Sequence, residues 1–254
     1  MAGHNKWSKI KHKKGAADSK RAKVWTKIIR EITVATRLGG PDADGNPRLR
    51  KAVDDAKAAN MTKDTVDRAI SRGAGDDDTE DYEELVYEGY GPAGVALYVE
   101  CTTDNRNRTG ADIRVAFKKN GGNLGALGSV GYLFDKKGHF VFEKEPDEGK
   151  APTEDALFEV GMEHGAEDVI DEDDVWEVVC LPNDFQDLRE AFVEAGFSPT
   201  AAQVAMLPQT TAKVAGGDVN MLLKLVDALE DLDDVQHVWG NFDIDPDELE
   251  AALG

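Results

Sequence analysis

The sequence predicts an α+β protein of three domains. The first is an N-terminal three-helix bundle, and the second and third are ferredoxin-like-type α+β domains, the third domain being inserted in the second. Three observations predict this architecture. Amphipathic helical periodicity fills the first 75 residues, strand and helix patterns alternate after an acidic linker, and a complete βαββαβ set of elements interrupts an incomplete one. The chain has 254 residues, enough for two or three domains.

The first three predicted elements are short amphipathic helices. A first helix is expected from Ala16, where apolar residues begin to recur on one stripe, and two consecutive glycines should end it at Gly39. Asn46 is predicted to cap a second helix, and Thr62 a third that ends near Gly73. Short connections between such helices favour an antiparallel bundle.

The middle domain is predicted in two separate pieces of the chain. The first piece holds strands at 84–91, 94–102 and 131–134, with a helix at 107–120. The second piece supplies the missing elements of the same domain, a helix at 218–232 and a strand at 235–244.

The third domain is a self-contained set of elements between these two pieces. Its predicted order is strand, helix, strand, strand, helix, strand, at 139–143, 153–165, 167–170, 175–181, 184–195 and 200–207. This order is that of the split βαβ unit.

The domain bounds follow from these elements. We expect a basic arm and helical bundle at 1–75, a middle domain at 82–134 plus 210–244, an inserted domain at 135–209 and a C-terminal tail at 245–254.

Charge is divided unevenly along the chain. The whole chain carries 30 Lys and Arg against 50 Asp and Glu, a net charge of −20, which by itself argues against a nucleic-acid partner. Up to Gly75, however, 18 basic residues face 8 acidic ones, and the remaining residues hold 12 basic and 42 acidic ones. A basic segment of +10 joined to an acidic one of −30 indicates a nucleic-acid-binding part. The alternative is that the basic part solubilises itself or docks on its acidic neighbour.

The arm, residues 1–15, and the first helix form the main candidate binding site. Lysines here can neutralise phosphates and release counterions. Trp7 could stack on a base or anchor the arm to the bundle, and both interpretations stay open. His12 is expected to add a hydrogen-bond donor and not to act in catalysis. The candidate nucleic-acid-binding residues are Lys6, Trp7, Lys9, Lys11, His12, Lys13, Lys14, Lys20, Lys23, Lys27 and Arg30.

A second candidate site joins a strand to a helix at residues 102–109. Free backbone N–H groups at a helix start favour an anion, and Arg106 and Arg108 could add phosphate contacts. The alternative is a capping turn whose arginines pair with the acidic surface of the same domain.

The other patterns favour structural roles. The glycine-rich segment 121–131 lacks the Lys-Ser/Thr ending of a phosphate-binding loop, so a mobile loop is expected. The acidic clusters 171–174 and 230–234 are expected to be solvated surface. Cys101 and Cys180 are expected to be buried free thiols, as is usual in the cytoplasm.

The sequence contains no clear signal of catalysis or of membrane insertion. The five histidines show no metal-ligand spacing, and neither a nucleophile elbow nor an HExxH motif occurs. We therefore expect a protein that is not an enzyme, with no metal and no cofactor. No run of about 18 apolar residues occurs, so no membrane association is expected. Nothing in the sequence indicates an oligomeric state.

Several segments resemble one family. The opening residues 1–14 are strongly similar to the start of the YebC/PmpR family, which includes the mitochondrial translational activator of cytochrome oxidase subunit I. Further matching segments lie at 26–31, 46–50, 87–92, 103–109, 121–125 and 233–236. Gly240 is a small departure, since a small polar residue or histidine is typical there.

The resemblance implies a three-domain protein with a helical N-terminal bundle and no established catalytic residues. Most members are called probable transcriptional regulators that bind DNA, and others look like ribosome-associated factors that help translation through proline-rich stretches. We therefore expect DNA or ribosomal RNA as the partner, with the ribosome as a further candidate. The family's basic residues correspond to Lys6, Lys11, Lys13, Lys14, Lys20, Lys27 and Arg30, and its Asn-Arg-Asn-Arg motif to Arg106 and Arg108.

The local sequence pattern does not distinguish a DNA-binding regulator from an RNA-binding translation factor. No helix-turn-helix spacing with a clear recognition helix is evident, so sequence-specific DNA readout has no support from the residues themselves. A regulator that binds DNA is the first expectation, and a ribosome-associated RNA-binding translation factor is the alternative.

Overall fold

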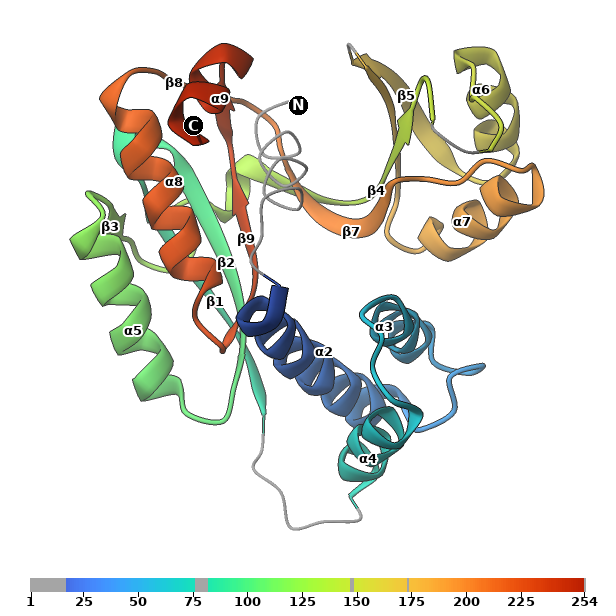
Figure 1. Cartoon of the computed structure of the whole chain (residues 1–254), viewed down its shortest axis with the longest axis horizontal. Helices are drawn as coiled ribbons and strands as arrows, with labels where there is room; N and C mark the ends of the chain where they lie inside the picture. Colours follow the sequence, from blue (N-terminus) through green and yellow to red (C-terminus); the bar gives the residue numbers. More distant parts are fainter. Residues whose placement is uncertain (1–16, 76–81, 147–148, 173, 254) are drawn as a thin grey trace. The chain divides into compact units, whose positions relative to one another are not determined.

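The computed structural model describes residues 17–75, 82–146, 149–172 and 174–253 (Figure 1). Residues 132–211 form one compact unit, and the remaining described residues form another. Both units combine helices with antiparallel sheets, which confirms the predicted α+β multidomain fold. The predicted residue bounds of the three domains stay predictions.

Three helices form the N-terminal bundle, α2 (Ala17–Gly39), α3 (Pro47–Ala58) and α4 (Lys63–Ala74). Helix α2 packs against both α3 and α4. The apolar stripe of α2 supplies its share of a small core, in which seven residues are buried: Ile32, Ala35, Leu49, Ala52, Ala56, Val66 and Ala69.

The predicted helix caps are present, and one of them does more than cap. Asn46 accepts a hydrogen bond from the Leu49 N–H at 3.1 Å, and its side-chain amide donates to the carbonyls of Ala35 at 2.8 Å and Gly40 at 2.9 Å. It therefore fixes the start of α3 against the end of α2. Gly40 has φ +87°, the left-handed conformation that ends α2 as predicted.

Four residues, 59–62, connect α3 to α4. Asn60 adopts φ +55°, and the N–H of Met61 donates to the Ala56 carbonyl at 2.9 Å. This is a Schellman-type helix end with asparagine at the left-handed position. The connection has the length of the turn in helix-turn-helix motifs, a spacing that the sequence pattern had not revealed.

The first sheet belongs to the middle part of the chain and has the order β3-β1-β2-β9. Its members are β1 (Glu83–Tyr90), β2 (Ala96–Thr103), β3 (Asn123–Leu124) and β9 (Val235–Gly240), all in antiparallel pairs. Strand β9 follows the other unit in the chain, so the sheet is completed by a segment more than a hundred residues away from β2.

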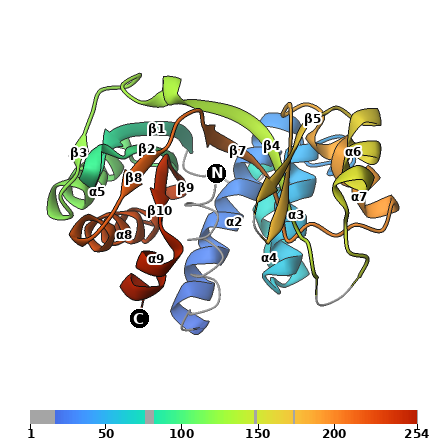
Figure 2. The ribbon, with the colours of Figure 1, turned by 90° about the horizontal axis from the view of Figure 1, so that it is seen from above.

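Two helices cover one face of this sheet, α5 (Arg106–Lys119) and α8 (Gly217–Glu230) (Figures 1 and 2). Their apolar residues pack on β2 and β9 in a continuous buried core that includes Leu97, Ile113, Phe117, Leu222 and Val238.

The structure corrects two details of the predicted middle domain. Residues Gly131–Leu133 form a 3-10 turn, and the third strand of the sheet is the two-residue β3 instead. The predicted strand 235–244 is divided at Asn241 into β9 and β10 (Phe242–Ile244), and β10 pairs in parallel with β8 (Ala212–Val214). The predicted tail contains helix α9 (Pro246–Leu253).

The second unit contains the βαββαβ elements in the predicted order. They are β4 (Phe134–Glu143), α6 (Glu154–Glu163), β5 (Ala166–Glu172), β6 (Val175–Cys180), α7 (Phe185–Glu194) and β7 (Ala201–Pro208). The antiparallel sheet order β5-β6-β4-β7 is that of a ferredoxin-like fold, with β6 splitting the βαβ unit formed by β4 and β5. Helices α6 and α7 supply apolar residues to one core with the sheet.

The glycine-rich segment is organised by one buried carboxylate. Glu88 on β1 is 3% exposed and accepts hydrogen bonds from the N–H groups of Gly128 at 2.8 Å, Val130 at 2.7 Å and Gly131 at 2.7 Å. Burial works against ionisation of Glu88, but the three N–H donors outweigh it and lower its pKa below the ordinary value. The segment predicted as a mobile loop is thus bound to β1 through a charged hydrogen-bond acceptor.

The two cysteines are buried free thiols, as predicted. Burial raises the pKa of Cys101 to about 12 and that of Cys180 to about 11. Both thiols therefore stay protonated at neutral pH, which makes them poor nucleophiles and poor metal ligands.

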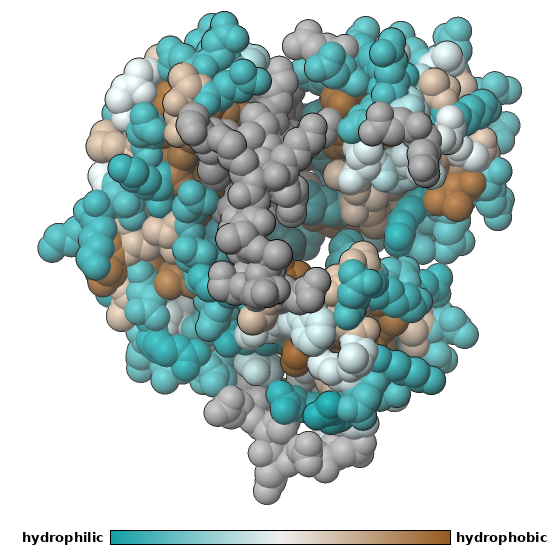
Figure 3. All heavy atoms as spheres, in the orientation of Figure 1, coloured by the Kyte–Doolittle hydropathy of each residue, from teal (hydrophilic) through white to brown (hydrophobic). Residues whose placement is uncertain are grey.

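Hydrophilic residues dominate the described surface on the face drawn in Figure 3, and hydrophobic residues there occur in small separate groups. Among the described helices, none is long and apolar enough to cross a membrane.

We predict that Glu88→Gln loosens the glycine-rich segment. The amide would place an NH₂ group against a backbone N–H, so the substitution should cost about 2 kcal/mol of local stability and speed hydrogen exchange at Gly128, Val130 and Gly131. Because the folded-state pKa of Glu88 is lowered, its contribution is present above the ordinary carboxyl value and disappears as the pH falls through the folded-state pKa.

Hydrogen exchange at neutral pH measures this effect, with Glu83→Gln as the control because Glu83 is an exposed carboxylate on the same strand. Equal exchange in the two variants would show that Glu88 does not hold the segment.

Candidate nucleic-acid interface

Three cations of α2 bind the segment that follows helix α8. Lys23 Nζ lies 3.0 Å from a carboxylate oxygen of Asp231, and Lys27 Nζ donates to the Glu230 carbonyl at 3.0 Å. Arg30 donates to the Asp233 carbonyl and pairs with the Asp234 carboxylate at 3.1 Å. These cations recur every three or four residues and lie on one side of α2, so they meet the segment as a row.

The end of α8 is suited to this row for two reasons. The last carbonyls of a helix lack intrahelical partners and carry partial negative charge. The carbonyls of Glu230 and Asp231 belong to this end and accept hydrogen bonds from the two lysines. The carboxylates that follow add full negative charges.

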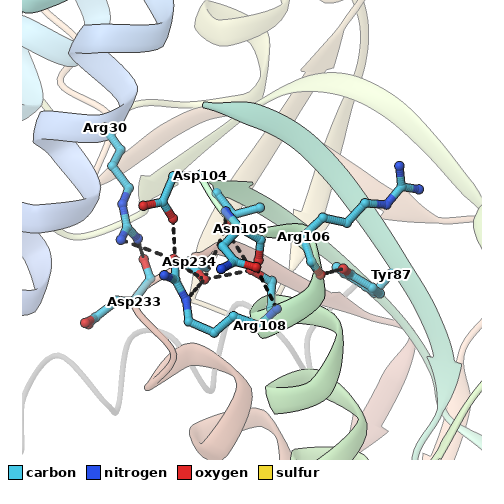
Figure 4. Close-up of polar contacts among 10 residues, drawn as sticks. Arg30, Tyr87, Asp104, Asn105, Arg106, Arg108, Asp233 and Asp234 are labelled. Atoms are coloured by element: carbon cyan, nitrogen blue, oxygen red, sulfur yellow. Dashed lines mark hydrogen bonds and ion pairs between the residues drawn. The ribbon is translucent and has the colours of Figure 1, made fainter. Parts of the chain in front are cut away.

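Asp234 is the centre of these contacts and is only 6% exposed. Its carboxylate lies 3.1 Å from Arg30 and 2.9 Å from Arg108, and it accepts a hydrogen bond from the Thr109 hydroxyl at 2.7 Å (Figure 4). One carboxylate thereby connects the first helix of the bundle to helix α5.

The start of α5 is built around the same carboxylate. Asn105 caps the helix by accepting from the Arg108 N–H at 3.1 Å, and Asp104 also pairs with Arg108, at 2.6 Å. The hydrogen bonds to Asp234 and then Asp104 raise the pKa of the Arg108 guanidinium, which remains charged at every accessible pH. The backbone carbonyl of Asp234 accepts from the Thr102 N–H at 2.8 Å, which fixes the carboxylate at the end of β2.

A second link between the bundle and the sheet is formed by Arg48. Its guanidinium pairs with Glu31 of α2 at 2.6 Å and with Glu84 of β1 at 2.6 Å. All three side chains are partly exposed, so each pair contributes at most about 1 kcal/mol. The buried Asp234 contacts are therefore the stronger link.

The structure places only part of the predicted site. The predicted residues of the arm, Lys6, Trp7, Lys9, Lys11, His12, Lys13 and Lys14, lie outside the described residues. Lys20 belongs to α2, but its side chain is outside the described part. For Lys23, Lys27 and Arg30, the structure shows docking on an acidic neighbour, the alternative that the sequence left open, and their contact with nucleic acid stays a prediction.

The predicted arginine pair is split by the structure. Arg108 belongs to a capping turn and pairs with acidic residues, as the alternative proposed. Arg106 is exposed, and Figure 4 shows its side chain pointing away from Asp234. The guanidinium group of Arg106 is therefore more available to an anion than that of Arg108.

The sequence predicts the cluster 230–234 as solvated surface, which holds for the exposed Asp231 and Asp233 and is wrong for Asp234. Asp234 is buried because two guanidinium groups and a threonine hydroxyl satisfy its oxygens. The composition of the cluster could not reveal this, but the matching row of cations on α2 was a signal.

The described residues offer little to a metal or cofactor. No group of three His, Cys, Asp or Glu side chains in this part of the chain could hold a metal ion. A shallow cavity of about 180 Å³ on the bundle is lined by Ile29, Thr65, Arg68, Ala69 and Arg72. Its two arginines make it cationic, which suits an anion and not a metal.

Two family models match the chain. Residues 5–76 match the TACO1/YebC protein N-terminal domain, and residues 82–242 match the TACO1/YebC second and third domain.

Relatives match this chain over their full length. The chain is 54% identical to a probable transcriptional regulatory protein of Geobacter sulfurreducens and 51% identical to one of Koribacter versatilis, with 100% of both chains covered in each case. It is also similar to the crystal structure of a conserved hypothetical protein, Aq1575, from Aquifex aeolicus, with a TM-score of 0.80 and 45% identity over 93% of this chain and 96% of that one.

We predict that Asp234→Asn destabilises the chain by about 2–4 kcal/mol, because Arg30 loses its carboxylate partner and Arg108 keeps only Asp104. Chemical denaturation followed by tryptophan fluorescence measures the loss. Asp233→Asn is the matched control, since Asp233 is exposed and contributes its backbone carbonyl to Arg30. A loss of the same size in both variants would contradict the special role of Asp234.

Proposed function

The chain belongs to the TACO1/YebC family, and on that premise we propose that it is a non-enzymatic, cytoplasmic nucleic-acid-binding regulator of gene expression, a DNA-binding transcriptional regulator. Its relatives are named probable transcriptional regulatory proteins, which supports a regulatory role. The proposal assigns binding to the basic N-terminal arm, the start of the first helix with Lys20, and the turn that carries Arg106.

The observation that carries the proposal is the concentration of positive charge. Between Lys6 and Arg30 the chain holds ten Lys and Arg and one acidic residue, in a protein whose net charge is −20. Lys23, Lys27 and Arg30 bind the protein's own acidic segment, and this leaves the lysines of residues 6–20 as the main source of charge for phosphates.

The connection between α3 and α4 supports DNA as the target. Its four residues and its left-handed Asn60 match the turn of a helix-turn-helix motif, whose second helix enters the major groove. Helix α4 buries Val66 and Ala69 and exposes Lys63, Arg68 and Arg72. Asp64 pairs with Arg68, so base contacts would involve a surface of both charges.

The alternative is a ribosome-associated RNA-binding translation factor. A lysine ammonium group binds the phosphates of DNA and of RNA in the same way. A cationic arm with Trp7 also suits irregular RNA, in which unpaired bases are open to stacking.

Crosslinking with sequencing of the bound nucleic acid, together with sucrose-gradient sedimentation of the native protein, separates the two functions. If the protein binds DNA, we expect promoter DNA to be recovered and the protein not to sediment with ribosomes. Recovery of ribosomal RNA, with the protein in the ribosomal fractions, would contradict the DNA-binding function and support the translation function.

We predict that replacing Lys11, Lys13, Lys14 and Lys20 with Ala weakens nucleic-acid binding. The slope of the logarithm of the binding constant against the logarithm of salt concentration should become smaller by about 3 to 4, because fewer phosphate contacts release fewer counterions on binding. Fluorescence anisotropy across a salt series measures both quantities. Lys136, Lys150, Lys213 and Lys224, exposed lysines of the acidic part, provide a control set with the same charge change. An unchanged slope in the arm variant would contradict the assignment of binding to this segment.

A further inference from the structure

Helix α5 is a cationic element in the acidic part of the chain. Its 14 residues contain Arg106, Arg108, Arg114, Lys118 and Lys119 against a single acidic residue, Asp112. The residues after Gly75 together carry a net charge of −30, so this helix is exceptional in its surroundings. A cation that is paired within the protein stabilises the fold, whereas an exposed, unpaired one is available to a ligand.

Three of the cations lie on one ridge of the helix. Arg106, Gly110, Arg114 and Lys118 are spaced four residues apart, which makes successive members neighbours on the helix surface. Arg106, Arg114 and Lys118 are exposed, and within the described residues their side chains form no hydrogen bond or ion pair. Arg108 is on another side of the helix and is bound to Asp104 and Asp234.

The partial charges of the helix do not explain this ridge. Lys118 lies in the last turn, where a cation is favourable, but Arg106 lies in the first turn, where the free N–H groups carry positive charge. A cation at that end is unfavourable unless an anion is near. Arg108 has two carboxylates that offset the effect, whereas Arg106 has none within hydrogen-bond distance among the described residues.

Tyr87 of β1 borders the same ridge. Its hydroxyl donates to the Arg106 carbonyl at 3.3 Å, and an added Cβ at Gly110 would lie 3.2 Å from that hydroxyl, so a glycine gives the ring the closest approach to the helix. Burial raises the pKa of Tyr87, and the positive charges of Arg106 and Arg114 partly oppose this rise.

We propose that the α5 ridge, defined as Arg106, Arg114 and Lys118, is a second binding surface for the phosphodiester backbone of nucleic acid, separate from the N-terminal arm. This inference rests on the proposed function and extends its contact at Arg106 along helix α5. The ridge spans twelve residues, or about 18 Å, so its three cations can contact separate phosphates. Guanidinium groups suit phosphate oxygens because they donate two parallel hydrogen bonds.

The test compares two variants of the full chain in anisotropy titrations with a labelled duplex DNA and a labelled single-stranded RNA. The ridge variant is Arg106→Gln, Arg114→Gln and Lys118→Gln, and the control is Lys136→Gln, Lys213→Gln and Lys224→Gln, which removes the same charge from other exposed positions. Relative to the control, the ridge variant should bind about 100-fold more weakly near 0.1 M salt and have a salt slope smaller by about 2 to 3. Thermal unfolding of both variants checks that the fold is retained.

The outcomes distinguish failure of the ridge proposal from failure of the proposed function. If the wild-type chain binds and the two variants behave alike, the ridge is not a binding surface, while the arm assignment stands. If neither nucleic acid binds the wild-type chain at any salt concentration, the proposed function fails and the ridge proposal fails with it. If only the ridge variant loses thermal stability, Arg114→Gln alone repeats the comparison, since Arg114 is exposed in mid-helix, and an unchanged salt slope then overturns the proposal.

Discussion

The buried carboxylate of Asp234 is the interaction on which the arrangement of the bundle and the first sheet depends. A carboxylate removed from water is stable only when it is paired and hydrogen-bonded. Asp234 meets this condition with Arg30 from α2, Arg108 from α5 and the hydroxyl of Thr109. Because its backbone carbonyl also binds the end of β2, four elements converge on one residue at the start of β9.

This arrangement changes the meaning of the charge division. A net charge of +10 in the first 75 residues could all be available to nucleic acid, but part of it is used inside the protein. Lys23, Lys27 and Arg30 face carboxylates and helix-end carbonyls, which hold the bundle on the sheet. Under the proposed function, the charge available to phosphates lies in the lysines of residues 6–20, on helix α4 and on the α5 ridge. A protein with this division would bind nucleic acid at defined points and repel it from the acidic surface elsewhere.

The fold was largely predictable from the sequence because its signals are local. Helix periodicity, the caps Asn46 and Thr62 and the alternating strands of the βαββαβ unit each depend on neighbouring residues. Strand β3 was missed because two residues carry no periodicity, and residues 131–133 were misassigned because their apolar composition resembles a strand.

The candidate site was predictable only in part, since its decisive contacts join distant residues. Asp234 looks like its neighbours Asp231 and Asp233 in composition, and only the position of Arg30, about two hundred residues earlier, makes it different. Glu88 similarly resembles any acidic residue of a half-exposed strand until three N–H groups are found around it. For Arg106 and Arg108, the sequence left two interpretations open, and the geometry assigns a structural pairing to Arg108 alone.

We propose that the cations of this chain are divided between internal pairing and nucleic-acid binding. Ultraviolet crosslinking of bound nucleic acid, followed by mass-spectrometric identification of the attached peptides, tests this division. We expect crosslinked peptides from residues 6–20 and from α5, and none from residues 22–31 of α2. Crosslinks concentrated in residues 22–31, with α5 unmodified, would contradict it.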